Sequence, residues 1–426
     1  MAEGAPYPQL ILTGRKGVEA ALGHPWVFSG NIVQHGAWDE ADDGAIVDLV
    51  TRSGRFVARG MLNKRSEIAV RVLTLDEQER VDAAFIRRRI ERALESRRRT
   101  LELDERSAYR VVFGEADGLP GLVIDSYAGH LVVQVHTLGM DRLKARVVEA
   151  LNAVLEPKSL YERSDLSVRE HEGLPTDVTG PLSDAEPPDR IEIVENALKF
   201  LVDVRHGQKT GLFLDQRENH MAIRRYVGAA GGTATSQARG ARVLDCFCYA
   251  GGFGLNALAA GAEHVTFVDS SERALDYARA NVAANGLLDD ARVGFVASHA
   301  KAFLEACANE GRTFGLIVLD PPGMAKIRRA VPKALAAHQT LHELALRALE
   351  PGGILASACC SAHILPDEFL ATLDLAARAA ACDLVLVETR GHPPDHPILL
   401  RFPEGRYLSL AVCEARTPGG AFAAQQ

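Results

Sequence analysis

Two neighbouring cysteines, Cys359 and Cys360, stand at the end of an apolar stretch that is typical of a β-strand. Successive side chains of an extended chain point in opposite directions, so only one of the two thiols should face a crevice there. Buried cysteine is ordinarily a small hydrophobe, whereas an ionised thiol is a nucleophile for covalent catalysis. Because other reactive residues end neighbouring apolar stretches, we expect one of these thiols to be a nucleophile.

A carboxylate on a rigid bend is the second reactive feature. Asp320 ends another apolar stretch and precedes Pro321 and Pro322. The prolines fix their own φ angles and push the preceding residue toward an extended shape. The bend should aim Asp320 into the crevice, where its oxygens could read the ring nitrogen and exocyclic amine of a nucleic-acid base. Pro321, Pro322 and Ser361 are assigned to the same substrate side.

A turn rich in glycine predicts a cofactor site. Asp245 ends an apolar stretch, and the turn that follows contains two adjacent glycines. Glycines at such a turn let the backbone approach a ligand. Asp269 ends the next apolar stretch roughly 20 residues on, the usual place for a carboxylate that binds ribose hydroxyls. The residues predicted to bind a nucleoside-bearing cofactor here are Asp245, Phe247, Tyr249, Gly251, Gly252, Asp269, Ser270 and Asp320.

Both NAD and S-adenosylmethionine (SAM) carry a nucleoside, and the position of Asp245 favours SAM. A dinucleotide needs the G-x-G-x-x-G spacing, so that its pyrophosphate can sit on a helix N-terminus. The spacing here is different, and a carboxylate before the turn would repel pyrophosphate. The same carboxylate suits the cationic sulfonium and amino group of SAM. An NAD-dependent dehydrogenase is therefore disfavoured.

A thiol, a base-reading carboxylate and a methyl donor together predict a specific reaction. Carbon 5 of cytosine is too poor in electrons to attack a methyl sulfonium, but addition of a thiolate at carbon 6 makes it nucleophilic. The thiol must ionise from a pKa of about 8.5, so a nearby cation or helix N-terminus should help. A paired cytosine would have to leave its stack to reach the crevice.

Three regions should position these residues. Short β-like runs in residues 1–75 predict a small β-barrel domain, and residues 76–185 predict a central α/β domain with helices at 81–103 and 141–155. The polar, proline-bearing stretch 180–190 reads as a linker. In residues 190–418 a predicted hairpin precedes strands that alternate with helices, which favours a doubly wound, Rossmann-like α/β domain. A glycine- and alanine-rich stretch at 227–240 is expected to be a loop.

Bulk properties exclude several protein classes. The chain has 426 residues, 47% of them hydrophobic and 24% charged, as in ordinary globular proteins. No apolar run is long enough for a membrane span and no secretory signal is recognisable, so a cytoplasmic protein with no membrane partner is expected. Seven cysteines in so long a chain fit reduced thiols. No metal site is predicted, and a homodimer is left open.

Local charge matters more than the net charge of −8, which by itself argues mildly against a nucleic-acid ligand. One basic cluster lies on a helical segment and is equally consistent with a solvated helix face. Its members are Arg87, Arg88, Arg89, Arg92, Arg97, Arg98 and Arg99. The second cluster follows the Asp-Pro-Pro bend and comprises Lys326, Arg328, Arg329 and Lys333.

Taken together, these motifs resemble a known family over almost the whole chain: the bacterial large-subunit ribosomal RNA cytosine-5 methyltransferases of the 23S rRNA methyltransferase I type. That family has an RNA-binding PUA domain, a central α/β domain and a class I SAM-dependent methyltransferase domain. The motifs that carry the resemblance, in chain order, are His24 to Gly30, Gly114 to Gly121, Arg163 to Asp165, Gly207 to Gly211, Leu214 to Arg217, Asp245 to Phe253, Asp269, Asp320 to Pro322, Cys360-Ser361, Asp395 to Pro397 and Pro403 to Gly405.

The resemblance implies a role for several residues. Cys360 matches the cysteine directly before the serine and would be the nucleophile, with Cys359 facing away. Asp320 would hold the target cytosine of 23S rRNA, single-stranded or flipped out of a helix. Lys209, Thr210, Asp269 and the Gly251 region would hold SAM.

Two positions depart from the family pattern. The family has an aspartate for the adenine amine where this chain has Ser298 and His299. Either one of these two residues takes over that contact, or the cofactor is bound more weakly. The family also tends to have lysine after Asp-Pro-Pro, where this chain has Gly323. Lys326, Arg328 and Arg329 are expected to supply the missing positive charge toward RNA phosphate.

Two other functions remain open at this point. A methyltransferase acting on a base amine would favour an aromatic residue after the two prolines, and Gly323 cannot stack on a base. A non-catalytic rRNA-binding assembly factor could keep the same fold, and the altered adenine contact gives that alternative some weight.

Overall fold

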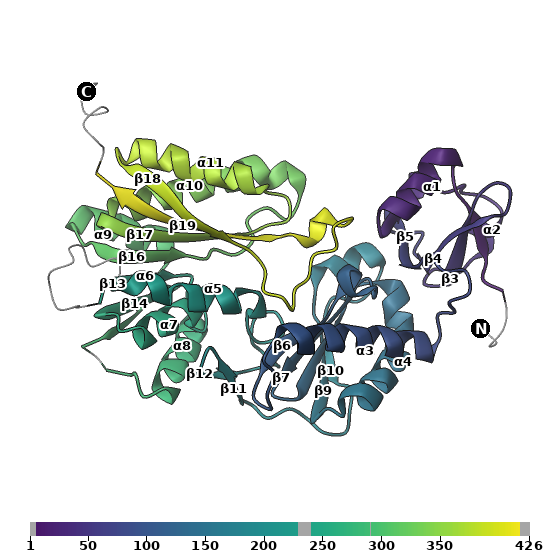
Figure 1. The fold of residues 1–426 in the computed structure, drawn as a ribbon, viewed down its shortest axis with the longest axis horizontal. Helices are drawn as coiled ribbons and strands as arrows, with labels where there is room; N and C mark the ends of the chain where they lie inside the picture. Colours follow the sequence, from purple (N-terminus) through teal and green to yellow (C-terminus); the bar gives the residue numbers. More distant parts are fainter. Residues whose placement is uncertain (1–5, 229–239, 290, 418–426) are drawn as a thin grey trace. The chain divides into compact units, whose positions relative to one another are not determined.

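The computed structural model describes residues 6–228, 240–289 and 291–417, and Figure 1 traces them. Most of the expected loop at 227–240 lies outside the described residues. The chain divides into two compact units. Unit 1 holds Met1–Ile193, Val202–Leu214 and Pro394–Gly405, and unit 2 holds Val194–Leu201, Asp215–Pro393 and Arg406–Gln426. Each unit therefore contains segments that are far apart in the sequence.

The first sheet of unit 1 has five strands in the order β1-β3-β4-β5-β2. Alternating apolar residues such as Val47, Leu49 and Val70 are fully buried in its core. The predicted β-rich pattern of this region is thus confirmed. Its elements are β1 (Gln9–Ile11), α1 (Gly14–Gly23), β2 (Trp26–Phe28), α2 (Ala37–Glu40), β3 (Ile46–Val50), β4 (Phe56–Leu62) and β5 (Ile68–Thr74).

The second sheet of unit 1 has the order β10-β9-β8-β7-β6 and packs against two long helices. Asp82 caps the first of them by accepting from the N–H of Phe85 at 2.8 Å. The predicted linker at 180–190 is shorter than expected, because Gly180 and Pro181 pair with β9 at the edge of this sheet. The elements are α3 (Ala83–Thr100), β6 (Ala108–Phe113), β7 (Leu122–Tyr127), β8 (His130–Val135), α4 (Leu138–Leu155), β9 (Ser159–Ser164) and β10 (Val178–Pro181).

Unit 2 is built on a seven-stranded sheet of order β15-β14-β13-β16-β17-β19-β18, and the preceding segment of the chain forms the two-stranded sheet β11-β12. Neighbouring strands are parallel except that β19 runs antiparallel to both β17 and β18. The strands are β11 (Ile191–Glu195), β12 (Leu198–Val202), β13 (Arg242–Cys246), β14 (His264–Asp269), β15 (Val293–Ala297), β16 (Phe314–Leu319), β17 (Leu349–Cys360), β18 (Asp383–Arg390) and β19 (Leu408–Arg416). This is the predicted doubly wound α/β domain.

Helices cover both faces of the seven-stranded sheet (Figure 1). Apolar side chains of α9, α10 and α11 pack on one face, with Leu304, Ala345 and Phe369 in their shared core. Helices α7 and α8 lie on the opposite face, against β13 and β14. The helices are α5 (Arg217–Ala222), α6 (Arg224–Val227), α7 (Gly252–Ala259), α8 (Glu272–Ala284), α9 (Ala300–Glu310), α10 (Val331–Arg347) and α11 (Pro366–Ala379). This layering brings the carboxyl ends of β13, β14, β16 and β17 to one edge of the sheet.

Candidate active site

Asp245 ends β13 as a buried carboxylate that has only half of its hydrogen bonds. The side chain is 1% exposed, and Oδ2 accepts from the N–H of Gly254 at 2.8 Å. Oδ1 is also buried and has no hydrogen-bond partner within the described chain. Burial raises the pKa of Asp245 to about 7, and the N–H of Gly254 opposes that rise only in part. A buried oxygen in this state is matched to a hydrogen-bond donor that the described residues do not supply.

The turn after β13 has an unusual backbone conformation. Phe247, Tyr249 and Gly251 have φ angles of 62°, 44° and 79°. The first two are unfavourable for L-residues, and such conformations cluster at ligand sites. Gly252 begins α7, and a Cβ atom added there would lie 2.3 Å from the ring of His220. The turn therefore requires glycine at 252.

Asp269, at the end of β14, is hydrogen-bonded to the same turn. Its Oδ2 accepts from the N–H of Tyr249 at 3.1 Å, and its Oδ1 accepts from the N–H of Ser271 at 2.9 Å. Ser270 is exposed beside it. The next strand end lies adjacent, because the N–H of Ser298 donates to the carbonyl of Asp269 at 3.0 Å. Asp269 and Ser298 are thus brought together at one edge, with His299 exposed next to them.

His220 is a buried residue of this region that the sequence did not single out. Its Nδ1 lies 2.8 Å from Oε1 of Glu195, and its ring packs edge-on against Phe253. Burial lowers the pKa of His220, but the charge and hydrogen bond of Glu195 outweigh it, so the pKa is raised overall. No local motif marks His220, because Glu195 lies 25 residues earlier in the chain. The His220–Glu195 pair therefore packs against the glycine turn at Gly252.

Cys360 lies beside the Asp-Pro-Pro bend. Its thiol donates to the carbonyl of Pro321 at 3.4 Å, and the residue is half-buried. Its neighbour Cys359 is 3% exposed and packs in the apolar core, where burial raises its pKa to about 11. The two thiols therefore take opposite faces of β17, as strand alternation requires. Of the two thiols, Cys360 is the one that contacts the Asp-Pro-Pro bend.

The loop after the bend is tied to the end of β17. Ser361 is buried, and its hydroxyl donates to the carbonyl of Ala325 at 2.8 Å. A Cβ atom on Gly323 would lie 2.9 Å from the carbonyl oxygen of Cys360. This close approach gives a physical reason for glycine in place of lysine at 323. Pro321 is buried and Pro322 is exposed, and their predicted contact with substrate stays a prediction, as does that of Ser361.

The second basic cluster lies at the start of α10. Lys326, Arg328, Arg329 and Lys333 are exposed, and the first turn of α10 carries no acidic residue. The positive end of the helix dipole adds to their charge. This surface suits an anion such as phosphate.

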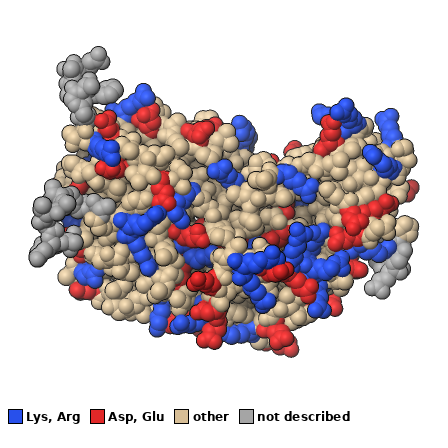
Figure 2. All heavy atoms as spheres, viewed as in Figure 1, with Lys and Arg blue, Asp and Glu red and all other residues tan. Residues whose placement is uncertain are grey.

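The first basic cluster is mostly engaged with acidic residues of unit 1. Arg97 is buried and forms two 2.7 Å hydrogen bonds to Asp117, and Arg89 pairs with Glu79 at 2.9 Å. Arg87 pairs with Glu91 one helical turn along, at 2.8 Å. On the face that Figure 2 shows, basic and acidic side chains are interspersed rather than segregated. The exposed ion pairs favour the solvated-helix interpretation for Arg87, whereas Arg97 is turned into the interior of unit 1.

Lys209 and Thr210 belong to unit 1, in the segment Val202–Leu214. Thr210 is fully buried, and its hydroxyl donates to Asp125 at 2.6 Å. Lys209 is exposed, with its Nζ 4.3 Å from the centre of the Phe213 ring. The structure gives the hydroxyl of Thr210 a role within unit 1, and cofactor binding by either residue stays a prediction.

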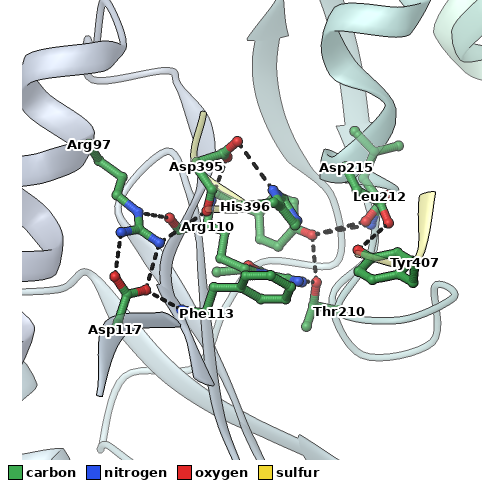
Figure 3. A network of polar contacts seen from close by, with 12 residues as sticks. Arg97, Arg110, Phe113, Asp117, Thr210, Leu212, Asp215, Asp395, His396 and Tyr407 are labelled. Atoms are coloured by element: carbon green, nitrogen blue, oxygen red, sulfur yellow. Dashed lines mark hydrogen bonds and ion pairs between the residues drawn. The ribbon is translucent and has the colours of Figure 1, made fainter. Parts of the chain in front are cut away.

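The Asp395-His396-Pro397 motif also lies in unit 1 and serves as an anchor there. Oδ2 of Asp395 accepts from the N–H of Arg110 at 2.9 Å, and its carbonyl accepts from Arg97 at 3.1 Å. Figure 3 shows Arg97 between Asp117 and Asp395. A buried network of this kind fixes the segment Pro394–Gly405 onto β6 and α3.

Comparison with known protein families agrees with the geometry of unit 2. Residues 122–401 match the family model described as S-adenosylmethionine-dependent methyltransferase. The chain belongs to this methyltransferase family. Residues 10–75 of the methyltransferase match a PUA-like domain model, which confirms the fold class predicted for its N-terminal region.

Relatives of this methyltransferase align over nearly its whole length. It is 37% identical to "Ribosomal RNA large subunit methyltransferase I" of Klebsiella pneumoniae subsp. pneumoniae over 409 residues, covering 96% of this chain and 98% of the relative. It is also 37% identical to the protein of the same name from Cronobacter sakazakii, covering 93% and 97%. These alignments therefore extend over both the PUA-like and the methyltransferase regions of this chain.

Solved structures show the same fold. One, described as a SAM-dependent methyltransferase from Streptococcus mutans, superposes with a TM-score of 0.78 at 18% identity, covering 95% of this chain and 99% of that chain. Another, SMU.776, was solved in complex with SAH and gives a TM-score of 0.79, again at 18% identity and with the same coverage. At this identity the likeness concerns the fold.

The residues of unit 2 fit the family's cofactor. The unpartnered oxygen of Asp245 suits a cationic amino group, and Gly251 and Gly252 form a turn whose close packing against Phe267 and His220 excludes larger residues. Asp269 adds a carboxylate at the next strand end. SAM is therefore the cofactor class of this family and is compatible with this strand edge.

Membrane-spanning helices and metal clusters do not occur among the described residues. Within residues 6–228, 240–289 and 291–417, no helix has the length and apolar character needed to cross a bilayer. The same residues contain no cluster of three His, Cys, Asp or Glu side chains placed to hold a metal ion.

Proposed function

We propose that this methyltransferase transfers a methyl group to carbon 5 of a cytosine in large-subunit (23S) rRNA, with Cys360 as the nucleophile. The observation that carries the proposal is the position of Cys360, half-buried with its sulfur 3.4 Å from the carbonyl of Pro321. The names of the 37% identical relatives support rRNA as the substrate, and the PUA-like domain supports an RNA ligand.

Asp245, Tyr249, Gly251, Gly252, Asp269 and Ser298 would hold SAM at the ends of β13, β14 and β15. When bound, SAM supplies an electrophilic methyl group. Asp245 would face its positive charge, and the resulting ion pair would stabilise the ionised carboxylate that burial disfavours. Lys209, Thr210, Phe247, Ser270 and His299 are further predicted contacts.

Cys360 would act on the cytosine and be regenerated. Its thiolate forms a bond from Sγ to carbon 6, and the electron pair of the 5,6 double bond moves toward carbon 5, which becomes nucleophilic. After carbon 5 has accepted the methyl group, a base removes its proton, the double bond reforms and the Sγ–carbon 6 bond breaks. Asp320 or a water molecule is the candidate base, and Asp320 would also accept a hydrogen bond from the cytosine amine.

The decisive experiment compares the two neighbouring thiols. Cys360→Ala should lower methyl transfer to large-subunit rRNA at least about 1,000-fold, because covalent activation is lost. Cys359→Ala, the matched control, should keep methyl transfer within about threefold and lose about 1 kcal/mol of stability. Methyl transfer from labelled SAM and SAM binding by calorimetry measure both. Full activity of Cys360→Ala would remove Cys360 as the nucleophile.

A trapped adduct would identify the target base directly. Substrate RNA that contains 5-fluorocytosine should form a covalent complex with the wild-type protein and none with Cys360→Ala, because fluorine cannot leave as a proton does. Denaturing gel electrophoresis and mass spectrometry would detect the adduct. Methylation of a base amine without an adduct would instead favour a base-amine methyltransferase.

The basic cluster before α10 offers a test of the RNA contact. Lys326→Glu with Arg328→Glu should weaken RNA binding and flatten its dependence on salt, since removal of a single phosphate interaction lowers the salt slope by roughly one. Binding measured at several salt concentrations gives both quantities. An unchanged slope would exclude these residues from phosphate contact.

A further inference from the structure

A chain of buried amides leads from Arg390 to the carboxylate of Asp320. Nε of Arg390 donates to Oδ1 of Asn219 at 3.1 Å, and Nδ2 of Asn219 donates to Oε1 of Gln216 at 2.6 Å. Nε2 of Gln216 then donates to Oδ1 of Asp320 at 2.9 Å. Gln216 and Asn219 are 3% and 1% exposed, so water does not compete for these contacts.

The direction of these hydrogen bonds follows from Arg390 alone. A guanidinium has donors and no acceptor, so the oxygen of the Asn219 amide must face it. The NH₂ group of Asn219 then faces Gln216, which must present its own oxygen to it. The NH₂ group of Gln216 is thereby left to face Asp320. The orientation imposed by Arg390 therefore directs the NH₂ group of Gln216, a hydrogen-bond donor, at Asp320.

Arg390 is itself held in place. Its Nη1 donates to Oε1 of Glu388 at 2.7 Å, and its Nη2 lies 3.8 Å from Oε2 of Glu218. Glu388 also accepts from Tyr226 and Arg225 at 2.6 Å each. The start of the chain is therefore fixed by an ion-pair network on β18, α5 and α6 that lies outside the reacting residues.

We propose that Gln216, Asn219 and Arg390 are positioning residues that hold Asp320 as an ionised hydrogen-bond acceptor for the target base. The inference rests on the proposed function, in which Asp320 accepts from the exocyclic amine of cytosine. A donor directed at a carboxylate favours its charged form. An acceptor at this place favours an amine at position 4 of the pyrimidine over the carbonyl of uracil, because two acceptors repel.

Other charged groups also act on Asp320. Asp245 at the end of β13 and His220 on α5 interact with it electrostatically, with opposite signs, and the thiol of Cys359 on β17 lies in its field. Substitutions in the amide chain leave these groups in place. A change in the pH dependence of the reaction can then be assigned to the chain.

The test is the pH profile of kcat/KM for methyl transfer to rRNA by the full-length protein. Gln216→Glu places a second carboxylate against Asp320, so the acidic limb should move to higher pH by at least about one unit. Asn219→Asp can only accept, which turns the Gln216 amide and presents its oxygen to Asp320. The acidic limb of the Asn219→Asp profile should move to higher pH by a smaller amount. The same smaller shift is expected for Arg390→Met.

Gln339→Glu on α10 is the matched control, because it introduces the same charge beside Glu343 and outside the amide chain. Its acidic limb should stay at the wild-type pH. SAM binding and the thermal midpoint report whether each variant is folded. If Gln216→Glu does not fold, Asn219→Asp still tests the proposal, because a shift in the same direction is expected from a residue that does not contact Asp320.

The outcomes separate the two proposals. Shifted limbs for Gln216→Glu and Asn219→Asp, with an unshifted control, support the positioning role. Variants that lose activity equally at every pH overturn it and leave the proposed function standing. Wild-type protein that transfers no methyl group to cytosine overturns the proposed function itself, and the positioning role falls with it.

Discussion

In unit 1, Asp125 is fully buried and both of its oxygens accept from the guanidinium of Arg110, at 2.7 and 2.9 Å. In unit 2, Asp245 is equally buried, yet one oxygen accepts a single backbone N–H and the other has no partner in the described chain. The pattern of Asp125 recurs in unit 1, where Asp48 pairs with Arg59 and Asp117 with Arg97. Asp125 and Asp245 are buried to the same degree, but only Asp125 has a hydrogen-bond partner for each of its carboxylate oxygens.

The difference separates structural from ligand-directed carboxylates. A buried ion pair repays the loss of hydration through its partner, and it keeps its partner in every state of the protein. A buried carboxylate with an unpartnered oxygen is costly, and the cost appears as the pKa of about 7 at Asp245, which the charge of His220 lowers only in part. Such a residue persists where a ligand supplies the missing charge. Asp245 should therefore matter for binding, and Asp125 for folding.

Removing the cation from the structural pair should have the largest effect. Arg110→Met leaves Asp125 buried and unpaired, and it should lower the stability of unit 1 by about 3–5 kcal/mol. The midpoint of urea-induced unfolding measures this loss. Arg87→Met, which breaks an exposed pair with Glu91, should change stability by no more than about 0.5 kcal/mol. Equal effects of the two substitutions would contradict the comparison.

Removing the charge of the ligand-directed carboxylate should act on binding instead. Asp245→Asn should weaken SAM binding by about 2–4 kcal/mol, since a buried charge on SAM would lose its partner. The unfolding midpoint without SAM should stay the same or rise, because a costly buried acid has gone. Isothermal calorimetry and thermal unfolding give the two quantities. Asp276→Asn, at an exposed position on α8, is the control. A loss of stability in Asp245→Asn without a loss of affinity would place Asp245 among the structural acids.

The pH dependence of Asp245 is the most specific effect. Its pKa is raised from the usual value for aspartate to about 7, so between roughly pH 4 and 7 the folded protein holds a proton that the unfolded chain has released. The contribution of Asp245 to the unfolding free energy of the ligand-free protein therefore falls as pH rises through this range.

Binding of SAM should show the opposite trend. Affinity should fall as pH drops below 7, because the protonated carboxyl no longer attracts a cation. Calorimetry in buffers of different ionisation enthalpy should detect proton release on binding near about pH 6.5, just below that pKa. Proton release that persists in Asp245→Asn would assign the titration to another group.

The sequence predicted the elements of the site better than the contacts behind it. Asp320 and Cys360 both follow apolar runs that end in polar residues, and parallel strands bring such ends to one edge, so their proximity could be expected. Gln216 was visible only as part of a family motif, and Asn219 and Arg390 not at all. Arg390 lies 171 residues from Asn219, and no local pattern encodes a hydrogen bond over that distance. The amide chain exists because β18 brings Arg390 next to α5.

Two structural details departed from the sequence pattern for identifiable reasons. The predicted linker begins later, because Gly180 and Pro181 still pair at a sheet edge, where a missing N–H does no harm. The arginines of α3 appear as one basic run in the sequence, but the helix turns Arg97 inward to Asp117 and leaves Arg87 outside with Glu91. Charge counted along a chain cannot distinguish these cases, because a helix distributes neighbours over all of its faces.

The sequence by itself determined which strand ends carry a carboxylate, a thiol and glycines, because apolar periodicity and turn residues are local properties. It also determined that one of two adjacent thiols faces away, since strand alternation follows from backbone geometry. Only the tertiary structure decided that one oxygen of Asp245 lacks a hydrogen-bond partner, while both oxygens of Asp125 have one. It also decided that the chain of amide donors ends on Asp320. Whether a buried charge has hydrogen-bond partners depends on residues from distant segments of the chain, and only tertiary packing brings those residues together.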